Sequence, residues 1–187
     1  MANDRDELKQ IVRQVSYEER EVTLASGRKS TFYFDGKQTT LHPRGAVLVG
    51  KAFFEELKHF PAPIDGVGGL TMGADPIATA LSMTSSLVGE PIPAFIIRKE
   101  PKGHGTGQWL EGRKNLAPGA RVVIVEDVLT TGGSALKAVE RAREEGLEVI
   151  GIISLVDREE GGREAVEAQG LALRAIFTKS EVVGDGN

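Results

Sequence analysis

Short apolar runs alternate with helical stretches along most of the chain, and this alternation constrains the fold more than any other feature of the sequence. The apolar runs predict strands over residues 64–68, 94–97, 122–125, 149–156 and 172–177. Apolar residues at helical spacing predict helices over residues 43–59, 75–88, 133–145 and 163–169. Strands that alternate with helices form a mostly parallel sheet, joined by right-handed crossovers. We therefore predict an α/β fold, a mostly parallel sheet flanked by helices.

The first forty residues follow a different pattern. Apolar residues at helical spacing predict an opening amphipathic helix, capped by Asn3 or Asp4; they are Leu8, Ile11, Val12 and Val15. Two strand-like runs, residues 21–24 and 31–35, flank a turn-rich segment and predict a hairpin. A chain of 187 residues suffices for one substantial core and is short for two. We predict a single domain over residues 1–187, with about residues 1–40 as a small hood on an α/β core of about residues 41–187.

Composition and charge argue against several classes of function. With 23 basic and 27 acidic residues the formal net charge is -4, which disfavours a broad surface for nucleic acid or for an anionic membrane. The chain contains no cysteine, so disulfides, thiolate chemistry and cysteine-based zinc sites are ruled out. The charged first twenty residues do not resemble a secretory signal, and no later segment resembles a membrane span. We expect a cytoplasmic protein that binds neither nucleic acid nor membrane.

One segment, Val122 to Ser134 with the sequence VVIVEDVLTTGGS, predicts a site for a phosphorylated ribose. Its apolar start suits a buried parallel strand, and Glu126 and Asp127 follow at the carboxyl end of that strand. Hydroxyls, glycines and backbone N–H groups of residues 130–134 precede a helix, an arrangement that binds anions. Ligands of open parallel sheets bind beyond the strands' carboxyl ends, so the carboxylates would hold ribose hydroxyls and the loop a phosphate. The alternative is an acidic turn before a threonine-capped helix.

Residues 99–112, KEPKGHGTGQWLEG, interrupt the alternation. They combine charge, glycines and a lone tryptophan without periodicity, and therefore predict a long mobile loop. Long loops in compact domains are often functional. By contrast, GAVLVGKA at residues 45–52 only nearly matches a P-loop, because Ala52 lacks the hydroxyl that would bind magnesium, and we interpret it as the interior of a helix.

Four segments together resemble one enzyme family. The run VVIVEDVLTTGGS resembles the 5-phosphoribosyl-1-diphosphate (PRPP) signature of type I phosphoribosyltransferases. SGRKS at residues 26–30 with the following TFYFD, RKEPKGHG at residues 98–105, and the pair Asp157 and Arg158 resemble segments of orotate phosphoribosyltransferases. The resemblance spans about Ser26 to Gly162. It implies the type I phosphoribosyltransferase fold and transfer of the 5-phosphoribosyl group from PRPP to orotate, giving orotidine 5'-phosphate and pyrophosphate in pyrimidine biosynthesis.

The resemblance also implies roles for individual residues. The implied PRPP contacts are Arg98, Lys99, Lys102, His104, Glu126, Asp127, Val128, Leu129, Thr130, Thr131, Gly132, Gly133 and Ser134. The implied catalytic residues are Lys99, Lys102, His104 and Asp127, and the implied orotate contacts are Thr130 and Arg158. Mg²⁺ would bind mainly through PRPP, without an assigned protein ligand. The family further implies a homodimer whose active sites are shared, because the basic loop reaches into the neighbouring subunit.

Two positions depart from the enterobacterial pattern of this family. Ala25 and Gly73 stand where that pattern has lysines, so two cations near the diphosphate are absent. We expect backbone amides of a pyrophosphate loop, formed by Thr71, Met72, Gly73 and Ala74, to take their place.

The acceptor base and the reaction have rival interpretations. Arg158 suits the orotate carboxylate because a guanidinium offers a planar fork, but an ion pair with Glu159 or Glu160 is the alternative. A purine phosphoribosyltransferase would share the PRPP signature without needing Arg158 or the RKEPKGHG loop. A PRPP-responsive transcription regulator would need a DNA-binding element, and the sequence contains no apparent helix-turn-helix with a basic recognition face.

Overall fold

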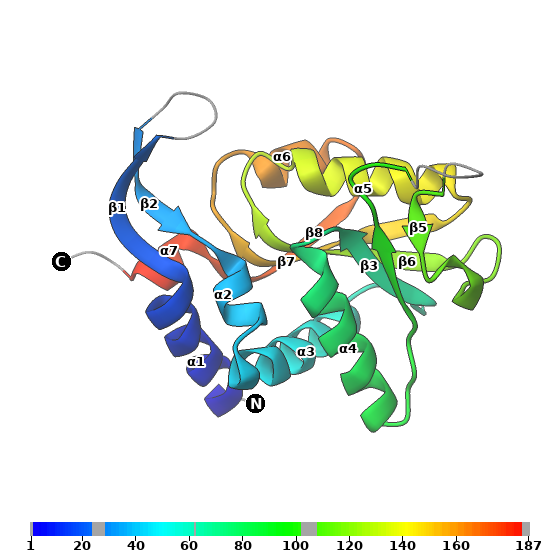
Figure 1. Cartoon of the computed structure of the whole chain (residues 1–187), viewed down its shortest axis with the longest axis horizontal. Helices are drawn as coiled ribbons and strands as arrows, with labels where there is room; N and C mark the ends of the chain where they lie inside the picture. The colour runs from blue at the N-terminus through cyan, green and yellow to red at the C-terminus, as the bar shows by residue number, and fades with distance from the viewer. Residues whose placement is uncertain (1, 24–28, 62, 102–107, 185–187) are drawn as a thin grey trace.

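A six-stranded sheet forms the centre of the computed structural model, which describes residues 2–23, 29–61, 63–101 and 108–184 (Figure 1). The strands are β3 (Gly66–Leu70), β4 (Ala94–Ile97), β5 (Leu110–Glu111), β6 (Arg121–Leu129), β7 (Glu148–Asp157) and β8 (Ala172–Thr178). Their order in the sheet is β5-β4-β3-β6-β7-β8. All neighbours pair in parallel except β5, which is antiparallel to β4. The α/β fold with a mostly parallel sheet is confirmed.

Helices cover both faces of this sheet (Figure 1). One face carries α1 (Ala2–Ile11) with a π-helical turn (Val12–Ser16), α3 (Pro43–Leu57) and α4 (Ala74–Leu87). The other face carries α5 (Gly133–Glu144) and α6 (Gly162–Glu167). A short 3-10 helix (Arg113–Asn115) precedes β6. No helix in the described part of the chain has both the length and the apolar character needed to cross a membrane.

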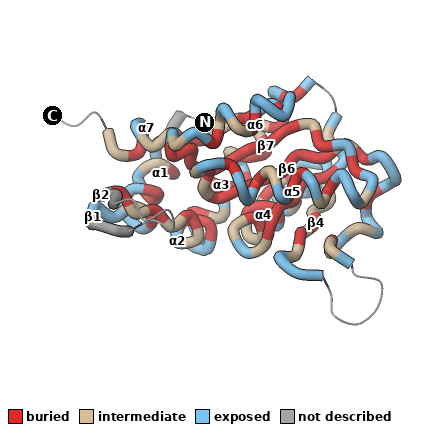
Figure 2. The backbone as a smooth tube through the Cα atoms, turned by 90° about the horizontal axis from the view of Figure 1, so that it is seen from above, coloured by how far each residue is buried: buried red, intermediate tan, exposed pale blue. Residues whose placement is uncertain are grey.

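The core has one layer on each side of the sheet, because strand side chains alternate in direction. On β6, Val123 and Val125 pack in the layer that contains α3 and α4, whereas Val122 and Ile124 pack in the layer that contains α5. All four side chains are fully buried. Figure 2 shows the buried strands between helices whose outer surfaces are exposed. This two-sided burial explains the unbroken apolar run at the start of β6.

The N-terminal region contains the helix and the hairpin that the sequence predicts. Strands β1 (Tyr17–Thr23) and β2 (Lys29–Phe34) pair antiparallel, with Tyr17 opposite Phe34. The rings of Phe32 and Phe34 are buried and stack with centroids 5.9 Å apart. Two short helices that the sequence analysis missed, α2 (Gly36–Thr40) and α7 (Lys179–Val183), lie nearby. The division of one domain into hood and core stays a prediction.

Two expectations about element boundaries are wrong. Residues 99–112 are not wholly without regular structure, because Leu110 in β5 pairs with Ile97 and the Arg98 N–H donates to the Trp109 carbonyl at 2.9 Å. β6 also continues through Leu129, so Glu126 and Asp127 lie within the strand rather than after it. β6 pairs with β7 as far as Leu129, which lies opposite Asp157. This pairing keeps the backbone extended beyond Glu126 and Asp127, where the two charged residues had suggested the end of the strand.

Candidate active site

Two adjacent carboxylates lie near the carboxyl end of β6, and both are nearly buried. Glu126 is 6% exposed and Asp127 is 8% exposed. Two glycines make room for Asp127, since a Cβ added at Gly36 would lie 2.8 Å from the Asp127 Cβ. A Cβ added at Gly73 would lie 2.9 Å from the Asp127 Cγ and 3.2 Å from the Glu126 Oε1. Three segments that are distant in sequence therefore meet closely around Asp127.

Glu126 is the electrostatically unusual member of the pair. Burial raises the pKa of Glu126 to about 9, and the neighbouring Asp127 carboxylate and its hydrogen bond add to the rise. The Glu126 Oε2 atom is buried and has no hydrogen-bond partner. A buried polar oxygen without a partner costs free energy unless a ligand satisfies it. Glu126 therefore fits a group that exchanges hydrogen bonds with hydroxyls of a bound sugar.

Replacing Glu126 with glutamine is expected to change how stability depends on pH. The folded protein holds a proton on Glu126 at pH values where the unfolded chain, with a pKa near 4.5, has released it. The free energy of unfolding therefore falls as pH rises toward 9, with this group contributing up to about 1.4 kcal/mol per pH unit. Glu126→Gln removes this contribution, so its stability advantage over the wild type should widen from about pH 6 to about pH 8. Urea unfolding of the ligand-free wild type and variant at each pH measures the free energy of unfolding. If this free energy changed with pH in parallel for the two proteins, the expectation would be contradicted.

The loop after β6 leads into a helix start that has the features of an anion site. Gly132 has a φ of 83°, a left-handed conformation that glycine adopts without steric cost, and α5 begins at the next residue. No side chain caps this helix, so its first N–H groups are available to a ligand. A cavity of about 330 Å³ opens on the loop. Its lining comprises Glu126, Val128, Leu129, Thr130, Thr131, Gly132, Gly133, Ser134 and Ala135.

A second cavity, of about 200 Å³, adjoins the first and shares Glu126 and Ser134 with it. Its remaining lining residues are Lys37, Leu70, Thr71, Met72, Gly73, Lys99 and Asp127. Lys37 and Lys99 are the cationic side chains among the described residues that line it. The two adjoining cavities together bring helix N–H groups, two acidic side chains and two lysines to one place. These groups suit a phosphate, a sugar and a second anionic group.

Arg158 and Thr130 lie next to each other at the carboxyl ends of β7 and β6. The Arg158 N–H donates to the Leu129 carbonyl at 2.9 Å, which fixes Arg158 beside the residue before Thr130. The guanidinium of Arg158 is buried, lies 5.0 Å from the centre of the Phe32 ring and pairs with Glu160 at 2.7 Å. The Arg158 Nε has no hydrogen-bond partner. The Glu160 ion pair is thus present, and one buried donor of Arg158 remains for a ligand.

Several residues implied by the resemblance are not in these cavities. Arg98 pairs with Glu111 at 3.1 Å and does not line the second cavity. Ala74 begins α4 and is fully buried, so of the pyrophosphate loop only the three preceding residues line the cavity. Lys102, His104 and Ala25 lie outside the described residues. Of the segment SGRKS, residues 26–28 also lie outside them, and the side chains of Lys29 and Ser30 are not described.

Lys37 is the cavity residue that sequence reasoning missed. It belongs to α2, a five-residue helix that carries no periodic signal. The Lys37 Nζ lies 2.6 Å from the Asp35 Oδ1 and 3.9 Å from the Asp127 Oδ2. The glycine before it was the one available signal, because a glycine at the start of a helix is compatible with close packing against another segment.

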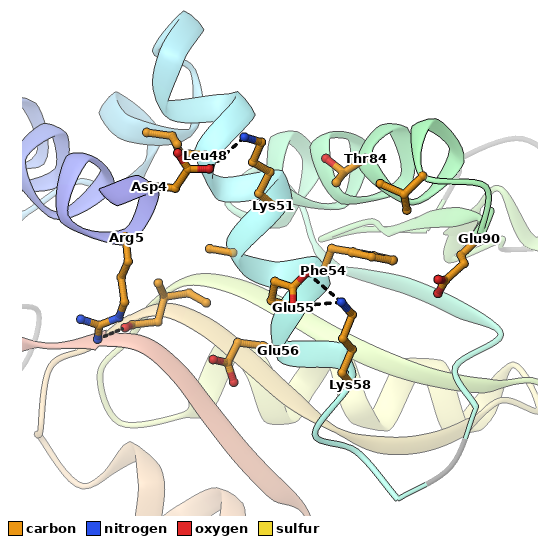
Figure 3. A pocket seen from close by; sticks show the side chains of 13 residues that line it. Asp4, Arg5, Leu48, Lys51, Phe54, Glu55, Glu56, Lys58, Thr84 and Glu90 are labelled. Atoms are coloured by element: carbon orange, nitrogen blue, oxygen red, sulfur yellow. Dashed lines mark hydrogen bonds and ion pairs between the residues drawn. The ribbon is translucent and has the colours of Figure 1, made fainter. Parts of the chain in front are cut away.

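A wider cavity of about 510 Å³ lies elsewhere, among α1, α3, α4 and the Ile176 region of β8 (Figure 3). The basic groups on its wall are already paired with acidic ones, as Lys51 with Asp4 at 2.8 Å and Lys58 with Glu55 at 2.8 Å. Its described lining contains none of the residues of the Val122 to Ser134 segment, so its size alone does not make it the active site. Among the described residues, no three acidic or histidine side chains are grouped to hold a metal ion.

Comparisons with known proteins agree with this geometry. Residues 35–169 match the family model described as the phosphoribosyl transferase domain. The orotate phosphoribosyltransferase of Sorangium cellulosum is 47% identical over 184 residues, which covers 98% of this chain and 95% of the relative. That of Aquifex aeolicus is 52% identical over 160 residues, covering 86% and 85%. The crystal structure of Mycobacterium tuberculosis orotate phosphoribosyltransferase in complex with PRPP has 40% identity and a TM-score of 0.80, covering 97% and 99%. This chain belongs to the orotate phosphoribosyltransferase family, among the type I phosphoribosyltransferases.

Proposed function

We propose that this chain transfers the 5-phosphoribosyl group from PRPP to orotate, with PRPP seated across the two adjoining cavities. The observation that carries the proposal is the sharing of Glu126 and Ser134 between those cavities. The 5-phosphate would bind the N–H groups at the start of α5, and the ribose hydroxyls would meet Glu126 and Asp127. The 1-diphosphate would then lie beside residues 71–73 and Lys99.

Catalysis would follow from stabilising opposite charges at the two ends of the bond that breaks. The anomeric carbon gains positive charge as its bond to the diphosphate lengthens, and the leaving pyrophosphate gains negative charge. The carboxylate of Asp127 lies on the sugar side, and the ammonium group of Lys99 neutralises the leaving group. Lys102 and His104, which the resemblance brings to the leaving group, remain predictions. No covalent intermediate with the protein is required.

The site suits a magnesium ion that is bound mainly by the substrate. The cavities contain two carboxylates, and one Glu126 oxygen has no partner. Mg²⁺ prefers oxygen ligands and is commonly bound by one or two carboxylates together with substrate phosphates. The residues thus suit an ion whose other ligands are oxygens of PRPP, with Asp127 as the nearby carboxylate and Glu126, whose pKa is raised to about 9, as a neutral acid beside it. When bound, Mg²⁺ adds positive charge to the leaving diphosphate.

Consumption of orotate tests the reaction directly. Orotate absorbance is expected to fall when the purified chain is mixed with orotate, PRPP and Mg²⁺, and to stay constant when PRPP is omitted. Adenine, hypoxanthine and uracil serve as matched acceptors in the same assay. Turnover of one of these bases without turnover of orotate would refute the acceptor assignment and leave the donor assignment intact.

Replacing Arg158 with lysine is expected to raise the KM for orotate about tenfold to a hundredfold, while the KM for PRPP stays close to that of the wild type. Lysine keeps a positive charge for Glu160 but lacks the planar fork that matches a carboxylate. Steady-state kinetics with each substrate varied in turn measures the two constants. An equal rise in both constants would instead indicate that Arg158 supports the whole site through packing.

We further propose a homodimer with shared active sites. The outer side of α4 and the loop before it carries apolar residues at helical spacing, namely Met72, Pro76, Ala80, Met83 and Leu87. Met72 is 65%, Met83 61% and Leu87 85% exposed. Such an exposed apolar stripe is typical of an interface. Because this stripe begins at Met72, which lines the second cavity, a partner bound to it would lie beside the diphosphate. Sedimentation velocity should therefore give the mass of a dimer.

A further inference from the structure

The second cavity contains a cation that does not belong to any of the four family-like segments. Lys37 comes from α2, between the hairpin and α3, and its side chain lines the cavity with Lys99, Asp127 and residues 71–73. The segments that carry the PRPP signature and the basic loop lie far away in the sequence. Lys37 is therefore an independent contribution of the N-terminal region to the diphosphate end of the site.

The backbone around Lys37 is built to bring this side chain to the cavity. Asp35 caps α2 by accepting a hydrogen bond from the Lys37 N–H at 3.1 Å, and the same carboxylate pairs with the Lys37 Nζ at 2.6 Å. Gly36 permits α2 to pack on β6, because any Cβ there would lie 2.8 Å from the Asp127 Cβ. Residues 35–37 thus fix both the start of the helix and the direction of the ammonium group.

The neighbouring carboxylates of Asp35 and Asp127 stabilise the positive charge of Lys37. The hydrogen bond that the Lys37 ammonium group donates to the Asp35 carboxylate is the main cause that raises the pKa of Lys37, and the charges of Asp127 and Asp35 raise it further. The ammonium group lies 3.9 Å from the Asp127 Oδ2, at the boundary between the sugar and diphosphate ends of the site.

We propose that Lys37 binds the 1-diphosphate of PRPP and supplies a cation that this chain lacks at Gly73. This inference rests on the proposed seating of PRPP. At Gly73 a side chain is blocked, because its Cβ would collide with the carboxylate of Asp127. Lys37 reaches the same cavity from α2, on the other side of Asp127. The cation is thus supplied from a different segment of the chain.

The competing explanation is that Lys37 only holds Asp127 in place for the ribose hydroxyls. Three ligands separate the two roles, namely PRPP, magnesium pyrophosphate and ribose 5-phosphate, with binding measured by isothermal titration calorimetry. Lys37→Met is expected to weaken PRPP and pyrophosphate binding about tenfold and to leave ribose 5-phosphate binding within about twofold. Lys37→Arg, which keeps the charge, is expected to restore most of the pyrophosphate affinity.

Lys51 provides the matched control, because it is also a half-exposed lysine paired with an aspartate, Asp4, but lies at the wider cavity away from the site (Figure 3). Lys51→Met should bind all three ligands like the wild type. Equal weakening of ribose 5-phosphate and pyrophosphate by Lys37→Met, or no weakening of pyrophosphate, would overturn the role of Lys37. A wild-type protein that fails to bind PRPP and ribose 5-phosphate would instead overturn the proposed function.

Discussion

An Asp127→Asn variant is expected to lose about a thousandfold in kcat, and a Lys102→Ala variant should lose a similar amount. A mixture of the two inactive variants is nevertheless expected to recover activity. Asp127 is nearly buried between Gly36 and Gly73, so asparagine fits in its place and the loss reflects the missing charge. If the basic loop serves the neighbouring subunit, a mixed dimer has one site with both substitutions and one site with neither. Random exchange makes about half of the dimers mixed, so recovery should approach about a quarter of wild-type activity.

Lys99 provides the internal control for this experiment. The resemblance carries the whole basic loop, Lys99 and Lys102 included, into the neighbouring subunit. Lys99, however, lines the same cavity as Asp127 within one chain, so we expect Lys102 but not Lys99 to serve the partner's site. A mixture of Lys99→Ala with Asp127→Asn therefore leaves one substitution in every site and should stay inactive. Activity is measured after subunit exchange, which is verified with differently tagged subunits. Recovery by the Lys99 pair, or none by the Lys102 pair despite exchange, would contradict the assignment of these residues to subunits.

The phosphate loop and the parallel sheet were predictable because their determinants are local. Hydroxyls, glycines and a helix start follow one another between Thr130 and Ser134, and the structure keeps that order along one cavity. Strand and helix periodicities likewise depend on neighbours in sequence. The sequence order alone was thus enough to predict that residues 130–134 form one loop before a helix, and the binding of a phosphorylated sugar there stays a prediction.

Contacts between distant segments were not predictable in this way. Apart from Gly36, nothing near Lys37 in the sequence indicates that α2 packs on β6, because that contact depends on how the hairpin region packs against the folded sheet. The end of β6 was misjudged for a related reason. A charged pair normally marks the end of a buried strand, whereas here Glu126 remains inside the strand with its pKa raised to about 9. Functional sites are where such local rules fail, since a ligand rather than the core accounts for the residue.

Introducing the lysine of the enterobacterial pattern at Gly73 is expected to reduce activity rather than improve it. The Cβ of any residue other than glycine at this position would lie 2.9 Å from the Asp127 Cγ, inside van der Waals contact. The Asp127 Oδ1 accepts a hydrogen bond from the Val128 N–H at 3.0 Å, so relief of the collision either moves the carboxylate off this hydrogen bond or shifts the pyrophosphate loop. A displacement of about 1 Å at a catalytic group costs on the order of a hundredfold in rate. We expect Gly73→Lys to lose about that much in kcat/KM for PRPP.

Gly73→Ala separates the steric effect from the effect of charge, because it adds the Cβ without the ammonium group. Both variants should be impaired to a similar degree, and thermal unfolding should show that both are folded. A Gly73→Lys enzyme with wild-type kcat/KM would show that the chain tolerates the enterobacterial arrangement and that glycine is incidental. Similar impairment of the two variants would show that the close approach of Gly73 to Asp127 excludes a lysine at that position. The cation must then come from a segment on the other side of the carboxylate, which is where Lys37 lies.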